Sequence, residues 1–175
     1  NGQFLASGSH DNHIDVYDVM KQYGRMGVCK GHASFVRHID WSSDSTILQS
    51  NSGDFEQMFW EVPVGKQIAF PADARNVDWA TWTSVVGWPV QGILPKYSMG
   101  TDVLSCDRSH TRTIVATGDS YGKLKLFQYP AHKGAAGRTF GGHSSKVTQT
   151  RFTFDDMYVI TVGADMTFCQ WRLVL

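Results

Sequence analysis

GHASFVRHIDWSSDSTILQSNSGDFEQMFWEV, residues 31–62, is the stretch of sequence that decides the fold. It holds two β-rich runs separated by a turn of small and acidic residues, and the second run ends on an aromatic side chain, Trp60. The pattern returns at residues 142–173, GHSSKVTQTRFTFDDMYVITVGADMTFCQWRL, where a Gly-His pair again precedes a tryptophan at the same distance. Repetition of a whole pattern at fixed spacing is typical of proteins built from one repeated supersecondary unit.

Four segments of the chain carry this pattern, and each ends on an aromatic residue. These aromatics are Tyr17, Trp60, Phe127 and Trp171, separated by 43, 67 and 44 residues. Separations of 43 and 44 residues lie within the period of about 40–45 that WD-repeat blades show. The middle separation is longer by about 24 residues, which indicates an insertion after Asn76. The spacing therefore predicts an all-β fold, a WD-repeat β-propeller.

Two sets of four polar or aromatic side chains recur at one spacing. In a WD blade, a histidine from the loop before the innermost strand meets a strand hydroxyl, a turn aspartate and an indole N–H. We expect the aspartate to accept a hydrogen bond from the histidine, so that every buried polar group of the tetrad has a hydrogen-bond partner. His, Ser and Asp together also suggest a nucleophile triad, but the repeated tryptophan favours a structural role. The predicted tetrads are His32, Ser50, Asp54 and Trp60, and His143, Thr161, Asp165 and Trp171.

Alternation of apolar and polar residues places the strands. No segment carries a convincing helix signal, and the outermost strands are short and polar, which protects a sheet edge from unwanted pairing. The expected strands are 36–42 and 147–154 (innermost), 47–52 and 158–163 (second), 57–62 and 168–174 (third), and 24–29, 66–70 and 137–141 (outermost).

These strands make about three and a half to four blades of a larger ring. The whole chain, 1–175, is one partial propeller whose blades cover about 1–29 (incomplete), 31–70, 76–141 with an insertion at 76–99, and 143–175. Propellers close with about 4–8 blades, and an open stack would expose strand edges. We therefore expect the remaining blades of the same propeller to be partners of this chain.

Composition excludes several classes of function. Lys plus Arg and Asp plus Glu are 16 each, so no overall field favours nucleic acid or an anionic membrane. The three cysteines, Cys29, Cys106 and Cys169, lack the spacing of zinc ligands, and we expect them reduced in the cytoplasm. No glycine-rich phosphate loop, HExxH or GxSxG motif is present. The sequence thus predicts a protein without catalytic residues, metal or cofactor.

Segments between the generic repeat positions also carry a specific pattern. These stretches are SHDNHIDVYDV (9–19), YGRMGVCKGH (23–32), HIDWSSD (38–44), SNSGDFEQMFWEVPVGK (50–66), DWATWTSVVGWPVQGILP (78–95), GTDVLSCDRSH (100–110), KLKLFQYP (123–130), GHSSKVTQTRFTFDD (142–156) and QWRLV (170–174). Through them the chain resembles the echinoderm microtubule-associated protein-like (EML) family nearly from end to end, and the insertion falls where that family carries a similar one. Phe127 and Tyr17 depart from the repeat tryptophan, outside the two tetrads.

The resemblance implies the C-terminal part of the second propeller in a tandem pair. It further implies a partner, tubulin or microtubules, and a location in the cytoplasm at the microtubule cytoskeleton, such as that of the axoneme or spindle. The implied function is a non-catalytic scaffold that binds tubulin through propeller surfaces. Fold alone does not fix a partner, so the alternative is a generic WD-repeat adaptor with a peptide-binding face in a signalling or ubiquitin-ligase complex.

Two sets of side chains are candidates for partner binding. Aromatic residues often centre interfaces, yet an insertion this apolar also serves to cover a blade edge or a neighbouring propeller. Basic residues suit an acidic partner such as tubulin, although scattered Lys and Arg are the usual solvated surface. The candidates are Trp79, Trp82 and Trp88 in the insertion, and Arg108, Arg112, Lys123, Lys125 and Lys133 with Lys146 on the following loop.

Overall fold

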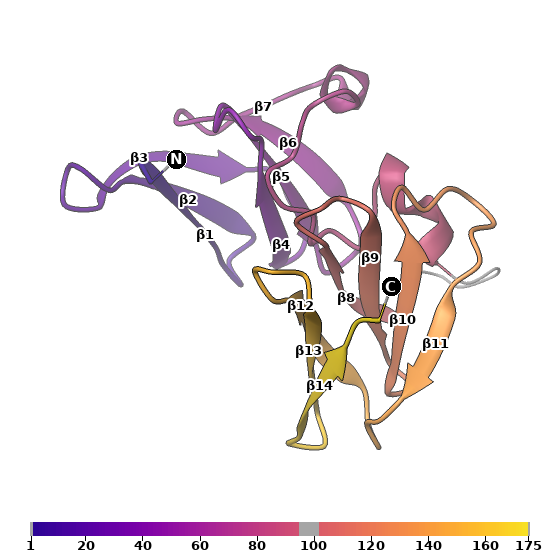
Figure 1. The fold of residues 1–175 in the computed structure, drawn as a ribbon. Helices are drawn as coiled ribbons and strands as arrows, with labels where there is room; N and C mark the ends of the chain where they lie inside the picture. Colours follow the sequence, from indigo (N-terminus) through magenta and orange to yellow (C-terminus); the bar gives the residue numbers. More distant parts are fainter. Residues whose placement is uncertain (1, 95–101, 175) are drawn as a thin grey trace. The chain divides into compact units, whose positions relative to one another are not determined.

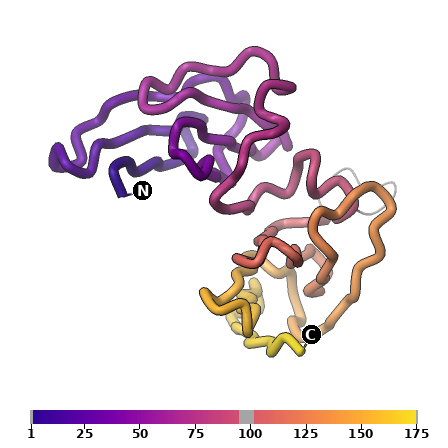
Figure 2. The backbone as a smooth tube through the Cα atoms, turned by 45° about the horizontal axis from the view of Figure 1, so that its top comes forward, coloured from indigo at the N-terminus to yellow at the C-terminus, as the bar shows by residue number. Residues whose placement is uncertain are grey.

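The computed structural model describes residues 2–94 and 102–174. Within that part of the chain, fourteen strands pair only antiparallel and form four sheets, and two short 3₁₀ helices are the remaining regular elements (Figure 1). The predicted all-β class is therefore confirmed. The strands divide into two compact units, residues 1–81 and 82–175, and in each unit the backbone turns back on itself in successive hairpins (Figure 2).

Unit 1 consists of two sheets packed on a shared apolar core. Ile14 and Val16 from one sheet meet Leu48 and Trp60 from the other, and all four are fully buried. A 3₁₀ helix, η1 (Pro71–Ala74), follows the second sheet. In order of pairing, the sheets are β1 (Phe4–Gly8), β2 (His13–Asp18) and β3 (Gly24–Lys30), and β4 (Val36–Trp41), β5 (Ile47–Ser52), β6 (Gln57–Glu61) and β7 (Lys66–Gln67).

Unit 2 repeats this arrangement. Ala116 and Leu124 from one sheet pack against Phe152 and Val159 from the other. A 3₁₀ helix, η2 (Trp88–Ile93), precedes the first sheet. The sheets are β8 (Val103–Arg108), β9 (Ile114–Asp119), β10 (Lys123–Gln128) and β11 (Arg138–Gly141), and β12 (Val147–Phe152), β13 (Tyr158–Gly163) and β14 (Phe168–Arg172).

The second strand of each four-stranded sheet is the most deeply buried. In β5 every residue after Ile47 is buried, although Gln49, Ser50, Asn51 and Ser52 are polar. Burial of polar groups is costly unless each finds a hydrogen-bond partner. The first predicted tetrad places its hydroxyl, Ser50, on β5, whereas the hydroxyl of the second, Thr161, lies buried on β13, the middle strand of a three-stranded sheet.

Predicted and observed strands differ mainly at their ends. The predicted second strands, 47–52 and 158–163, coincide with β5 and β13, whereas the outermost strand predicted at 66–70 is only Lys66–Gln67. The strand stops early because the chain turns through Ile68–Phe70 into η1, whose Pro71 lacks an N–H for sheet pairing. The sheets span residues 4–30, 36–67, 103–141 and 147–172, while the exact blade limits stay a prediction.

Candidate functional site

Hydrogen bonds join all four side chains of the second predicted tetrad. Nε2 of His143 lies 2.8 Å from Oγ1 of Thr161, and the indole N–H of Trp171 donates to the same oxygen at 2.8 Å. Nδ1 of His143 lies 3.2 Å from Oδ1 of Asp165. The ionised carboxylate of Asp165 can only accept, so Nδ1 donates to it and Nε2 of the neutral ring accepts from the hydroxyl of Thr161. The imidazole proton therefore resides on Nδ1 and points at Asp165.

Asp165 also fixes the two loops that meet at the histidine. Its Oδ2 accepts from the backbone N–H of Ser144 at 2.8 Å, and its Oδ1 accepts from the hydroxyl of Thr167 at 2.8 Å. The hydrogen bond from Thr167 is the largest cause that holds the pKa of Asp165 well below its ordinary value, and the bonds from Ser144 and His143 act in the same direction. This carboxylate stays ionised and ties the β11–β12 loop to the β13–β14 turn.

The first tetrad is only partly formed. Nε2 of His32 lies 2.6 Å from Oγ of Ser50, and Trp60 donates to that oxygen at 2.8 Å. The prediction that Asp54 accepts a hydrogen bond from His32 is wrong. Nδ1 of His32 instead faces Oε2 of Glu56 at 3.5 Å, and Asp54 accepts a short hydrogen bond from the hydroxyl of Ser52.

One residue explains why the hydrogen bonds of the two tetrads differ. Ser52 occupies the repeat position that Gly163 occupies in the second copy. A Cβ atom at Gly163 would lie 2.4 Å from Oδ1 of Asp165 and 2.5 Å from Nδ1 of His143. In the first tetrad the side chain of Ser52 thus fills the space between the aspartate and the histidine, and its hydroxyl donates a hydrogen bond to Asp54. Sequence reasoning missed this position, although the Ser-to-Gly difference was visible in the alignment of the repeats.

Burial dominates the chemistry of His32. Its side chain is 1% exposed, and removal from water lowers its pKa, because the charged form loses hydration. The hydrogen bond and charge of Glu56 act in the opposite direction but do not reverse the shift. His32 is therefore held neutral, as a network histidine requires.

The third sheet replaces the tetrad with an ion pair. Thr117 stands at the hydroxyl position, is fully buried, and makes no side-chain hydrogen bond among the described residues. Phe127 stands at the aromatic position and has no N–H to donate. Nζ of Lys125 lies 2.9 Å from Oδ2 of Asp119, which is 1% exposed. Lys125, one of the partner-binding candidates, is therefore not a free cation, because its charge is paired with a buried carboxylate.

The other predicted basic residues do not form one cluster. Arg108 is 8% exposed, and its guanidinium lies over the ring of Tyr129, 5.2 Å from the centroid. Arg112, in the turn after β8, is exposed, and so are Lys123 and Lys146. Because β9 separates the turn of Arg112 from the turn before Lys123, these two side chains lie at opposite ends of the sheet. The basic candidates that were named as one set therefore do not lie together, and Arg108 is largely buried.

Two of the three predicted aromatic anchors are buried. Trp79, in unit 1, is 5% exposed and packs against Phe59 with a centroid distance of 5.9 Å. Trp82, in unit 2, is 2% exposed and donates its indole N–H to the carbonyl oxygen of Ser84 at 2.9 Å. Trp88 is half-buried at the start of η2. Because Trp79 and Trp82 are buried, they are not exposed anchors for a partner. This part of the insertion instead packs against the rest of its own unit.

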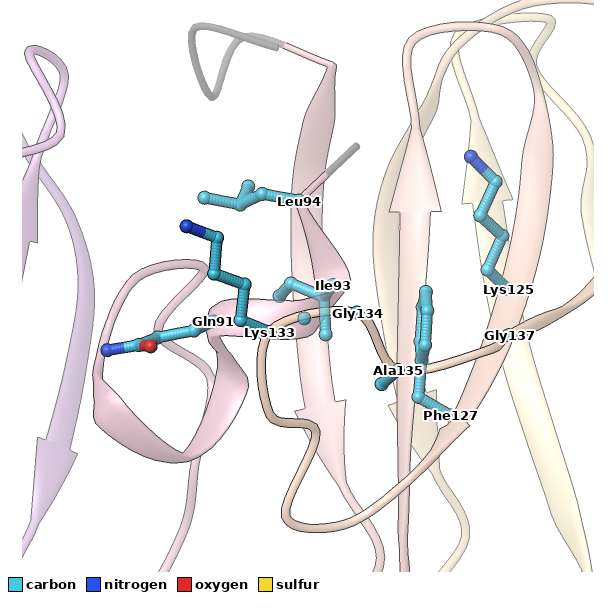
Figure 3. Close-up of a pocket in the computed structure, with 10 residues that line it drawn as sticks. Gln91, Ile93, Leu94, Lys125, Phe127, Lys133, Gly134, Ala135 and Gly137 are labelled. Carbon is cyan, nitrogen blue, oxygen red and sulfur yellow. The ribbon is translucent and has the colours of Figure 1, made fainter. Parts of the chain in front are cut away.

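A groove of about 720 Å³ lies in unit 2 between η2 and the loop that follows β10. Figure 3 shows Ile93, Leu94 and Lys133 on one side and Lys125 and Phe127 on the other. Sequence reasoning named Lys125 and Lys133 in one set of candidates and the insertion in another, and did not bring the two sets together.

Other kinds of site find no support in the described residues. No group of three or more His, Cys, Asp or Glu side chains in residues 2–94 and 102–174 could hold a metal ion. No helix of that part of the chain is long and apolar enough to span a membrane.

Comparison with known sequences gives one consistent result. A family model described as the echinoderm microtubule-associated protein second beta-propeller matches residues 1–173. The 77 kDa echinoderm microtubule-associated protein of Lytechinus variegatus is 49% identical over 99% of this chain and 27% of its own length. Echinoderm microtubule-associated protein-like 4 of Homo sapiens is 44% identical over 99% of this chain and 18% of its own length. The chain thus spans about a fifth to a quarter of these curated relatives.

Solved structures agree on the fold. A chain in the crystal structure of the mitotic checkpoint complex superposes with a TM-score of 0.76 at 18% identity, covering 100% of this chain and 62% of that one. The β-propeller domain of Cps50 (Swd1) from Myceliophteria thermophila gives 0.70 at 15% identity, covering 99% and 62%. The β-propeller fold predicted from the repeat spacing is confirmed, and the sheets here correspond to part of such a ring.

Proposed function

The chain belongs to the echinoderm microtubule-associated protein family, as part of its second β-propeller, and on that premise we propose that it is a non-catalytic scaffold segment that attaches to tubulin or microtubules. The family match over residues 1–173 is the observation that carries the proposal. The names of the relatives refer to microtubule association. The same premise supports a place in the cytoplasm, at the microtubule cytoskeleton.

The geometry supports a scaffold better than an enzyme. The histidines of the two predicted tetrads, His32 and His143, are buried: His32 bonds to Ser50 through Nε2, and His143 bonds to Thr161 and Asp165. A general base must reach a substrate proton, and both side chains are at most 1% exposed. These networks hold strands in place, which leaves the exposed loops and edges to contact partners.

The basic side chains suited to an acidic lattice are those that remain exposed. Lys123 and Lys146 meet that condition. They belong to the same end of unit 2, because the turn before Lys123 packs on the loop before Lys146: a Cβ at Gly122 would lie 2.8 Å from the carbonyl oxygen of Ser145. Exposed charges at the rim of an interface raise association rates and make binding sensitive to salt.

Co-sedimentation of the full-length protein with polymerised tubulin tests the proposal. We expect the double variant Lys123→Glu/Lys146→Glu to bind less than the parent at about 50 mM salt, with the difference shrinking toward about 300 mM as charges are screened. The control Lys30→Glu changes an exposed residue of unit 1. Equal binding of parent and double variant at every salt concentration would contradict attachment through this end, and no binding by the parent would favour the adaptor alternative.

A further inference from the structure

We propose that the groove between η2 and the loop after β10 binds an extended acidic peptide that presents one apolar side chain beside a carboxylate. The proposal concerns residues 91–94 and 125–137 and assigns a binding mode that family membership does not specify. It extends the proposed function, since such a peptide could belong to the microtubule or to another partner, but its test does not require tubulin.

Phe127 forms part of the base of the groove and fixes the loop that follows β10. Its ring packs against Gly137 of that loop, where a Cβ would lie 2.5 Å from the ring. A side chain larger than glycine at this position would therefore displace either the ring or the loop.

Backbone hydrogen bonds fix the two walls relative to each other. The N–H of Gly92 donates to the carbonyl oxygen of Ala131 at 2.7 Å, and the N–H of Ala131 donates to that of Pro89 at 2.8 Å. The N–H of Ala135 donates to the carbonyl oxygen of His132 at 2.9 Å, and this hydrogen bond closes a turn in the loop. Walls that are already ordered lower the entropic cost of binding, because less freedom is lost when a ligand arrives.

The groove is apolar at its base and positive at its rim. Ile93 and Phe127 are buried beneath it, and Leu94 is half-buried. The described residues that line it contribute two ammonium groups, from Lys125 and Lys133, and no carboxylate. Figure 3 shows Lys133 beside Leu94 and Lys125 on the other side of the groove, next to Phe127. A ligand that buries an apolar side chain between them would place a neighbouring carboxylate near either amine.

The two lysines would have different tasks. Lys125 is held by the buried carboxylate of Asp119, and an ammonium group has three N–H donors, so donors remain for a ligand. Lys133 is exposed and makes no ion pair with another described residue. Lys133 therefore supplies the net positive charge, whereas Lys125 supplies a fixed hydrogen-bond donor. This charge balance selects an acidic peptide over a basic or neutral one.

Titration of the full-length protein with a fluorescein-labelled synthetic peptide of glutamates around a central leucine, followed by anisotropy, tests the proposal. We expect Lys133→Glu to weaken binding about threefold to tenfold. We expect Ala135→Trp, which fills the groove from its half-buried wall, to abolish binding, whereas Lys30→Glu should have no effect. The melting temperature of each variant establishes that it is folded.

A matched peptide with glutamine in place of glutamate should bind at least about tenfold more weakly, since it lacks the charges that face the lysines. Equal binding of the two peptides, or equal binding by the parent and Lys133→Glu, would overturn the proposal. Absence of peptide binding by the parent would also overturn it. Co-sedimentation of the same parent protein with polymerised tubulin reports separately on the proposed function, so the two failures are distinguishable.

Discussion

Replacing Thr161 by Val removes one oxygen from the centre of the second tetrad and almost nothing else. Valine has nearly the shape of threonine, so the side chain still fills its fully buried site. The indole N–H of Trp171 then loses its acceptor and Nε2 of His143 loses its donor, both now at 2.8 Å. Nδ1 of His143 keeps Asp165, so the imidazole stays in place with one nitrogen unmatched.

Each buried polar group left without a partner costs about 1–3 kcal/mol. Two groups are affected, and some relaxation of the ring is expected, so Thr161→Val should destabilise the propeller by about 2–4 kcal/mol. For a domain of 150–250 residues, 1 kcal/mol lowers the melting temperature by about 2–4 °C. We therefore expect a decrease of about 4–16 °C in the full-length protein.

The third sheet supplies a matched control. Thr117 occupies the same repeat position and is equally buried, but its hydroxyl has no hydrogen-bond partner among the described residues. Thr117→Val removes an unsatisfied polar group, so it should leave stability unchanged or raise it by up to about 1 kcal/mol. Thermal unfolding of both variants measures the difference. Equal losses in Thr161→Val and Thr117→Val would refute the assignment of the network as the stabilising element.

Gly163→Ser should lower the melting temperature and disturb the bond between His143 and Asp165, because the new Cβ would lie within 2.5 Å of both side chains; thermal unfolding beside a control exchange at the exposed Ser145, Ser145→Ala, would show this. Acidification should lower stability from about pH 6.5 downward, since burial depresses the pKa of His32 and the unfolded chain takes up the proton first; a melting temperature that rises over that interval would contradict the neutral state of His32. Burial raises the pKa of Cys29 to about 12, so this thiol should escape alkylation at about pH 8 in the native protein and react on unfolding. Rapid labelling of native Cys29 would show that the core of unit 1 is open.

The sequence predicted the parts of the structure that depend on local repetition. The distance from His32 to Trp60 and from His143 to Trp171 is a property of one blade, and in both copies the histidine, hydroxyl and indole meet. The role of Asp54 was wrong because it depends on Ser52, which competes for the carboxylate. The hydroxyl oxygen of Ser52, two residues before Asp54, decides which group the aspartate accepts from. The spacing of the repeat residues gives no information about such a competing side chain.

The candidate surface was less predictable because it depends on contacts distant in sequence. Residue type alone could not show that Arg108 lies over Tyr129 or that Lys125 neutralises Asp119. The groove needs the insertion at residues 91–94 to meet a loop about 40 residues later, which follows from packing and not from periodicity. Basic residues in a sequence indicate charge, whereas burial decides which of them a partner can reach.

Zero-length coupling of lysine amines to carboxylates on microtubules, followed by mass spectrometry, tests the central claim most directly. The experiment uses the full-length protein bound to polymerised tubulin at low salt. We predict cross-links from Lys123 or Lys146, both exposed, to acidic residues of tubulin. Cross-links to tubulin that come only from residues outside this chain would contradict attachment through this part of the propeller.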